Sequence, residues 1–172
     1  MNYSAIKPND IANGDGVRVS LFVSGCRNCC KGCFNPETWS FSAGEEFTEA
    51  TEEEILKLLD RYYINGLTLL GGDPFEIENQ RGLINLIRKA RERYPDKTIW
   101  AYTGYLYDVD LQEGGKRYCE VTKELLEAIS VLVDGPFVED LKDISLKFRG
   151  SSNQRLIDLD KTSKSGKIIL LS

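Results

Sequence analysis

The residues with the clearest chemical capability are four cysteines within the stretch 25–35, which reads Gly-Cys-Arg-Asn-Cys-Cys-Lys-Gly-Cys-Phe-Asn. Thiolates are soft, anionic ligands for zinc, cuprous copper and iron-sulfur clusters. Cysteines that lie two or three residues apart on one loop can turn several sulfur atoms toward one centre. The stretch therefore predicts a metal or cluster site, or a group of redox-active or structural thiols.

The cysteine spacing permits two sets of ligands. Cys26-x3-Cys30-x2-Cys33 offers three ligands and leaves Cys29 over, which suits a four-iron cluster with one iron open to a non-protein ligand. Pairing Cys26 with Cys29 and Cys30 with Cys33 offers four ligands, which suits a closed tetrahedral zinc site. We favour the cluster, because Cys29 and Cys30 are adjacent and their side chains start out pointing apart. Disulfides fit less well, because the cysteines are not spread through the chain and no secretion signal is visible.

The composition is that of an ordinary globular protein. The 172 residues fit one domain, and 22 Lys and Arg against 27 Asp and Glu give a net charge of −5. We therefore expect no general nucleic-acid binding, no membrane association and a cytoplasmic location. The chain has no histidine. This excludes a Ser-His-Asp triad, a Cys-His dyad and a His-ligated zinc, so any chemistry must use cysteine, carboxylates, Lys, Tyr or a cofactor.

Apolar periodicity predicts strands alternating with helices. A capping box at 51–54 should open the first helix, a second helix should cover 78–93, and a third should begin at Thr122. The expected strands are 17–24, 67–70, 97–102, 131–133 and a terminal 167–171. This order indicates an α/β domain with a largely parallel sheet, followed by an irregular, basic segment over 138–172.

The unusual residues of the chain follow the expected strands. The cysteine loop, the turn 71–74 (Gly-Gly-Asp-Pro), the stretch 102–104 (Tyr-Thr-Gly) and the pair 134–135 (Asp-Gly) all occupy such positions. Functional loops of parallel sheets gather at the strand C-termini, so we expect these four segments to meet. The Gly-Gly-Asp-Pro turn has two interpretations. Asp73 and Pro74 could simply begin a helix, or the glycines could let a polar ligand approach the backbone closely.

A three-cysteine loop after one strand and a Gly-Gly-acid turn after the next resembles the radical S-adenosylmethionine superfamily. Within it, the chain resembles the activating proteins of anaerobic ribonucleoside-triphosphate reductase, which are glycyl-radical enzyme activases, and the likeness extends over nearly the whole chain. The motifs that carry it are residues 13–18 (Asn-Gly-Asp-Gly-Val-Arg), 24–26 (Ser-Gly-Cys), 33–35 (Cys-Phe-Asn), 100–105 (Trp-Ala-Tyr-Thr-Gly-Tyr), 133–137 (Val-Asp-Gly-Pro-Phe) and 149–154 (Arg-Gly-Ser-Ser-Asn-Gln).

The resemblance implies a single domain over 1–172 with a partial, laterally open (β/α) barrel. It also implies one [4Fe-4S] cluster per chain, whose three protein ligands are Cys26, Cys30 and Cys33, with Cys29 left out. S-adenosylmethionine would occupy the fourth iron, and no catalytic residue is implied beyond the cluster and this cofactor. One electron from the reduced cluster would cleave the sulfonium to methionine and a 5′-deoxyadenosyl radical, which takes a hydrogen atom from a glycine of the reductase.

The same resemblance implies further residues around S-adenosylmethionine. The backbone of Gly71, Gly72 and Asp73 would receive its amino group. Thr103 and Asp134 lie where related activases contact the nucleoside or a monovalent cation. In addition, the residue before the third cysteine is Gly32, where much of the superfamily has an aromatic that packs on adenine, so we expect Phe34 to supply that packing.

The implied partners are the large subunit of the anaerobic ribonucleoside-triphosphate reductase and an electron donor such as flavodoxin or ferredoxin. Arg149 and Arg155, in the basic segment, are our candidates for reductase binding, and we expect Cys119 to be a buried free thiol. Two alternatives stay open. The chain could activate another glycyl-radical enzyme such as pyruvate formate-lyase, or it could be a non-enzymatic zinc or iron-sulfur binding module.

Overall fold

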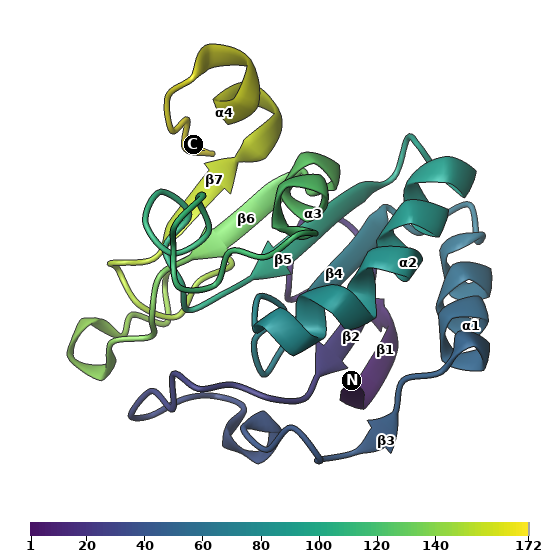
Figure 1. Cartoon of the computed structure of the whole chain (residues 1–172), viewed down its shortest axis with the longest axis horizontal. Helices are drawn as coiled ribbons and strands as arrows, with labels where there is room; N and C mark the ends of the chain where they lie inside the picture. The colour runs from purple at the N-terminus through teal and green to yellow at the C-terminus, as the bar shows by residue number, and fades with distance from the viewer. Residues whose placement is uncertain (172) are drawn as a thin grey trace.

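The computed structural model describes residues 1–171, and these form one mixed sheet with helices packed mainly on one side (Figure 1). The seven strands lie in the order β3-β1-β2-β4-β5-β6-β7. Their bounds are β1 Asn2–Asp10, β2 Arg18–Val23, β3 Glu45–Glu46, β4 Gly66–Gly71, β5 Thr98–Tyr102, β6 Val131–Asp134 and β7 Arg155–Asp158. The helices are α1 Glu49–Leu59, α2 Ile77–Arg93, α3 Thr122–Ala128 and α4 Leu159–Ser165, with short 3-10 turns η1 Pro36–Thr38 and η2 Glu139–Leu141.

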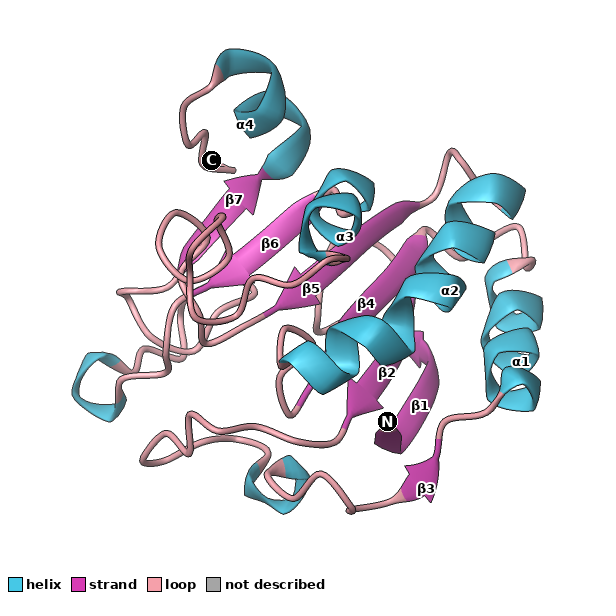
Figure 2. Ribbon diagram, viewed as in Figure 1, coloured by secondary structure: helices cyan, strands magenta, loops and turns pink. Residues whose placement is uncertain are grey.

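The centre of the sheet is parallel, as expected. β2, β4, β5 and β6 pair in parallel, whereas β1, β3 and β7 pair antiparallel at the two sides. Along the chain, α1, α2 and α3 connect successive central strands, as parallel pairing requires, and Figure 2 shows α2 and α3 in front of the sheet. Within residues 1–171, no helix is long and apolar enough to cross a membrane.

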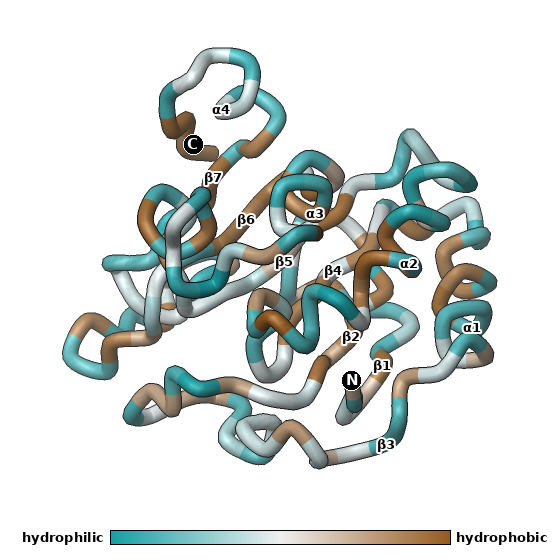
Figure 3. Tube along the Cα trace, viewed as in Figure 1, coloured by the Kyte–Doolittle hydropathy of each residue, from teal (hydrophilic) through white to brown (hydrophobic). Residues whose placement is uncertain are grey.

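The two faces of the sheet differ in chemistry because successive side chains point to opposite sides. One face presents apolar residues to the helices, and these belong to the main core; they include Val19, Leu21, Leu67, Leu69, Ile99, Ala101 and Leu132. The opposite face presents more polar and aromatic residues, including Arg18, Ser20, Thr68, Trp100 and Tyr102. Figure 3 shows the apolar strands at the centre and hydrophilic stretches along the helices.

Arg18 closes the polar face at the N-terminal ends of the strands. It is 1 % exposed, and among residues 1–171 it has no carboxylate partner. Its guanidinium instead donates to the carbonyl oxygens of Asp15, Leu67 and Thr98 and to the hydroxyls of Thr68 and Thr98, at 2.8–3.0 Å. Burial lowers the pKa of Arg18 to about 10. The N-terminal end of this face is therefore filled by protein.

Three expectations for the fold were wrong. Helix α1 is capped by Thr48, which exchanges hydrogen bonds with Thr51, so the capping box lies one turn before 51–54. The stretch 167–171 forms only an isolated bridge, between Leu170 and Ile157. The segment 138–172 is not wholly irregular, because it contains β7 and α4. Helix α2 begins at Ile77, close to the expected 78, so of the two interpretations of the Gly-Gly-Asp-Pro turn the helix start at Asp73 and Pro74 does not hold.

Candidate iron-sulfur site

A cavity of about 540 Å³ lies at the C-terminal ends of the parallel strands. Its walls come from the cysteine loop after β2, the Gly-Gly-Asp turn after β4, residues 102–104 at the end of β5, and the segment that follows β6. Figure 1 shows the loop after β2 and the segment around η2 at the same end of the sheet. The four segments that the sequence singled out therefore do meet.

The cysteine loop directs three of its four sulfur-bearing residues to the cavity. Cys26, Cys30 and Cys33 line it and are partly buried, whereas Cys29 is exposed and is absent from its walls. Cys29 has a left-handed backbone, with φ of 45°, which is uncommon outside glycine. Within residues 1–171 no group of three or more Cys, Asp or Glu side chains lies close enough together to hold a metal ion. The three-cysteine ligand set therefore stays a prediction.

Hydrogen bonds fix both ends of the cysteine loop. The backbone N–H of Gly25 donates to the Thr38 carbonyl at 2.7 Å, and that of Cys26 donates to the Trp39 carbonyl at 3.1 Å. At the far end, the Asn35 N–H donates to the Cys33 sulfur at 3.4 Å. Hydrogen bonds to ligand sulfurs are among the features that tune iron-sulfur clusters, so this donor set fits such a group.

Two of the cavity thiols hold their protons strongly. Burial, with a contribution from the nearby Asp73 carboxylate, raises the pKa of Cys26 to about 12, and burial also raises the pKa of Cys30. Both thiols are therefore protonated at neutral pH in the metal-free protein. Metal ligation requires the thiolate, so binding a metal centre at this loop must release protons.

The Gly-Gly-Asp turn packs directly against the start of the cysteine loop. The Gly72 N–H donates to the Val23 carbonyl at 2.7 Å, and the Asp73 N–H donates to the Gly25 carbonyl at 2.8 Å. A Cβ atom on Gly72 would lie 2.6 Å from the Gly25 oxygen and 2.8 Å from its nitrogen. The absence of a side chain at Gly72 is therefore required by contact with the loop backbone, whether or not a ligand also approaches.

The Asp73 carboxylate is buried at the centre of the site. Oδ1 accepts from the Thr103 hydroxyl at 2.8 Å and from the Phe75 N–H at 2.9 Å. Oδ2 accepts from the Gly104 N–H at 2.9 Å and from the Asn28 side chain at 3.1 Å. Burial raises the pKa of Asp73 to about 7, although these donors oppose the shift. One carboxylate thus joins the turn, the end of β5 and the cysteine loop.

The remaining predicted residues separate into two groups. Thr103 lines the cavity beside Asp73, and Phe34 lines it while staying 60 % exposed. The Phe34 ring lies 5.0 Å from that of Phe137, so this aromatic pair flanks the cavity. Asp134 is not among the lining residues. Its buried carboxylate accepts from the Tyr107 N–H at 2.8 Å and pairs with Arg155 on β7.

Arg149, Arg155 and Cys119 have contacts that bear on their expected roles. Arg155 also pairs with Asp108 at 2.8 Å, so its guanidinium is engaged within the protein and is a poor candidate for reductase binding. Arg149 lines the cavity but donates to the backbone carbonyl of Gln154 at 2.6 Å. Cys119 is free and only half-buried.

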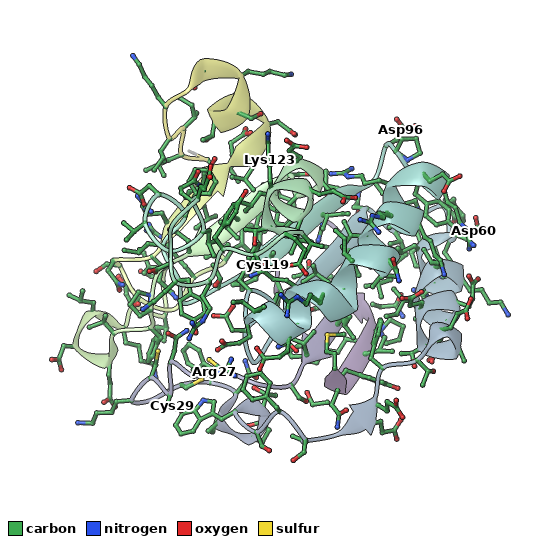
Figure 4. All side chains as sticks on the ribbon, viewed as in Figure 1. Arg27, Cys29, Asp60, Asp96, Cys119 and Lys123 are labelled. Atoms are coloured by element: carbon green, nitrogen blue, oxygen red, sulfur yellow. The ribbon has the colours of Figure 1, made fainter. Side chains whose placement is uncertain are left out.

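Sequence analysis missed the two residues that extend this network, Arg27 and Glu76. Glu76 is fully buried and contacts Arg27, which directly follows Cys26 (Figure 4 labels Arg27 and Cys29 on the loop). The signal that could have pointed to Glu76 is its place three residues after Asp73.

The comparisons with known proteins agree with this site. Residues 12–157 match the family model described as a 4Fe-4S single cluster domain, which defines the chain as a member of that class of iron-sulfur proteins. The chain is 43 % identical over 157 residues to the anaerobic ribonucleoside-triphosphate reductase-activating protein of Haemophilus influenzae, covering 90 % of this chain and 96 % of that protein.

Two further relatives carry the same name. The protein of Escherichia coli strain K12 is 43 % identical over 156 residues, covering 90 % of this chain and 96 % of its own length. That of Enterobacteria phage T4 is 41 % identical over 156 residues, covering 91 % of this chain and 93 % of its own length. The chain therefore belongs to the family of anaerobic ribonucleoside-triphosphate reductase-activating proteins.

Proposed function

We propose that this chain is a radical S-adenosylmethionine activase that installs a glycyl radical on an anaerobic ribonucleoside-triphosphate reductase. Membership of the activating-protein family and the match to a 4Fe-4S domain support this function. When bound, a reduced [4Fe-4S] cluster and S-adenosylmethionine supply the electron and the sulfonium whose cleavage yields the hydrogen-abstracting 5′-deoxyadenosyl radical. The chain itself binds, orients and encloses these groups.

The observation that carries the proposal is the division among the loop cysteines. Cys26, Cys30 and Cys33 line one cavity, whereas Cys29 is exposed outside it. This division favours the three-ligand register, which leaves one iron open for a non-protein ligand. A zinc site with four thiolates would also need the sulfur of Cys29, which is exposed and does not line the cavity.

The cavity also has walls suited to a charged, polar cofactor with an aromatic base. The Gly71, Gly72 and Asp73 turn borders the cysteines and would receive the amino group of S-adenosylmethionine through its carbonyls. Phe34 offers a ring at the mouth for adenine, and Thr103 offers a hydroxyl beside Asp73. Asp134 does not line the cavity, so it would contribute indirectly, by fixing the end of β6 through its bonds to Tyr107 and Arg155.

The proposal also covers the shape of the sheet and the partner proteins. The four parallel strands with flanking helices would form the partial, laterally open barrel of the radical S-adenosylmethionine type, as one domain over residues 1–172. The protein substrate would be the large subunit of the reductase, because the relatives are named for activating it. An electron donor such as flavodoxin or ferredoxin would reduce the cluster.

The testing experiment is electron paramagnetic resonance on anaerobically reconstituted, dithionite-reduced protein, with and without S-adenosylmethionine. The wild type should give a four-iron signal that shifts when the cofactor is added. Cys29→Ala should keep this signal and Cys30→Ala should lose it, so the two adjacent cysteines serve as each other's control. One zinc per chain with no cofactor-sensitive signal would refute the proposal, as would a signal that depends on Cys29.

A further inference from the structure

The carboxylate of Glu76 contacts three separate segments of the chain while fully buried. Its Oε2 accepts from the backbone N–H of Arg27 at 2.6 Å and from the hydroxyl of Tyr105 at 2.8 Å. Its Oε1 lies 2.9 Å from Nη1 of Arg27 and 3.0 Å from Nε of Arg117. Each oxygen thus has two partners, and two guanidinium groups balance the buried charge.

The contacts of Glu76 are not those of a helix cap. Glu76 is the residue before α2, where a Ser, Thr, Asp or Asn side chain would ordinarily accept from the first free N–H groups of the helix. Its side chain makes no such hydrogen bond. The carboxylate is turned toward the cysteine loop instead, so helix initiation does not account for it.

The bond to the Arg27 N–H acts on the loop backbone itself. Arg27 directly follows Cys26, so this bond fixes the main chain one residue after a predicted ligand. The Arg27 side chain also reaches the exposed Glu78 at 2.6 Å, and its guanidinium lies 4.5 Å from the centre of the Phe41 ring. Glu78 therefore holds only the side chain, whereas Glu76 holds the side chain and the backbone.

We propose that Glu76 is a positioning residue for the cysteine loop. It fixes the backbone after Cys26 before any cluster is bound, so that the loop meets iron in a conformation already directed at the cavity. Preorganisation of this kind reduces the ordering that accompanies binding. We call the bonds from Glu76 to the backbone and side chain of Arg27 the clamp. The clamp is a property of the metal-free chain, whereas its consequence for cluster loading rests on the proposed function.

The first test measures amide hydrogen exchange in the metal-free, reduced protein, by mass spectrometry on peptides that cover 25–30. In Glu76→Gln the side chain keeps its size but loses its charge. The NH2 group of the glutamine cannot accept a hydrogen bond, so it would face N–H or O–H donors that the carboxylate oxygen had accepted from. We expect exchange in these peptides to be at least tenfold faster, with α2 and the central strands unchanged. Glu78→Gln, which alters only the exposed contact of Arg27, is the matched control and should stay within twofold of wild type.

A second, milder variant keeps the test decisive if Glu76→Gln does not fold. Tyr105→Phe removes one of the two donors to Oε2 and keeps the buried ring, so exchange over 25–30 should rise about threefold or more. Exchange within twofold of wild type in the folded variants would overturn the clamp. A uniform rise across the whole sheet would also overturn it, because Glu76 would then be supporting general stability.

The second test measures iron and sulfide per chain after reconstitution with ferrous iron and sulfide. We expect Glu76→Gln to take up less than half the iron of wild type and Glu78→Gln to match wild type. Faster loop exchange with full iron uptake would overturn the positioning role. If the wild type itself took up no cluster, the proposed function would fail while the exchange data still decided the clamp.

Discussion

The ion pair between Arg155 and Asp134 offers the sharpest test of how this fold is held together. Asp134 ends β6 and Arg155 begins β7, and the two residues are directly paired in the sheet. Arg155 donates from Nε to Oδ1 at 2.9 Å and from Nη2 to Oδ2 at 2.6 Å. The Asp134 side chain is fully buried, whereas that of Arg155 is 28 % exposed. Arg155→Ala would therefore leave a buried carboxylate with one remaining donor, the Tyr107 N–H.

The expected loss is large because the remaining charge cannot reach water. Removing one partner of a buried pair typically costs about 3–5 kcal/mol, and the exposed edge of Arg155 places this case near 3 kcal/mol. Without the guanidinium, the buried carboxylate would keep one of its three hydrogen bonds, so the free energy of unfolding should fall by about this amount.

The assay is urea unfolding of the reduced, metal-free protein at pH 7. Arg88→Ala is the matched control, because Arg88 makes the same two-bond contact with Glu124 at 2.6 and 2.7 Å, but on the surface. We expect little or no change in the control. Adding Asp134→Asn to Arg155→Ala should recover part of the lost stability, because the double variant buries no unpaired charge. Equal losses from Arg155→Ala and Arg88→Ala would refute the reasoning, since burial is the main difference between the two pairs.

Two further predictions concern the turn after β4. Gly72→Ala should prevent the turn from packing on the cysteine loop, because its Cβ would lie 2.6 Å from the Gly25 oxygen. A thermal melt should show a clearly lower melting temperature, and an unchanged one would contradict the close contact. Because the pKa of Asp73 is raised to about 7, its folded state binds the proton more tightly, so its contribution to stability is lost as pH rises from about 4 to 7. Relative to Asp73→Asn, the wild type should lose about 4 kcal/mol over this range in urea unfolding, and parallel curves would show that Asp73 does not titrate there.

The central strands were predictable because a parallel sheet leaves a strong record in sequence. The expected strands at 17–24, 67–70, 97–102 and 131–133 match β2, β4, β5 and β6 to within one residue at each end. These strands are buried on both faces, so they contain runs of apolar residues bounded by polar or glycine-rich turns. β1 and β7 were missed because strands at the sides of the sheet are short or half exposed, and their side chains carry little periodic signal.

The walls of the site were predictable from the sequence, but the contacts within it were not. Strand ends in a parallel sheet share one edge, so the meeting of the four loops followed from their positions. The bonds of Asp73 to Asn28 and of Glu76 to Arg27 join residues 45 and 49 positions apart. Such pairings depend on the orientation of individual side chains after folding, and nothing local in the sequence specifies them.

The N-terminal ends of the central strands differ from their C-terminal ends, because protein side chains and backbone groups fill them. Arg18 directs its whole guanidinium to backbone carbonyls and hydroxyls at the N-terminal ends of three strands. A buried arginine without an acidic partner keeps all its hydrogen bonds in this way, yet still bears a desolvation cost, which its lowered pKa reflects. At the C-terminal ends, the buried acids Asp73 and Glu76 instead hold adjacent residues of the cysteine loop. One end of the sheet is thus closed by protein groups that satisfy one another, and the other end places its cysteines around a cavity.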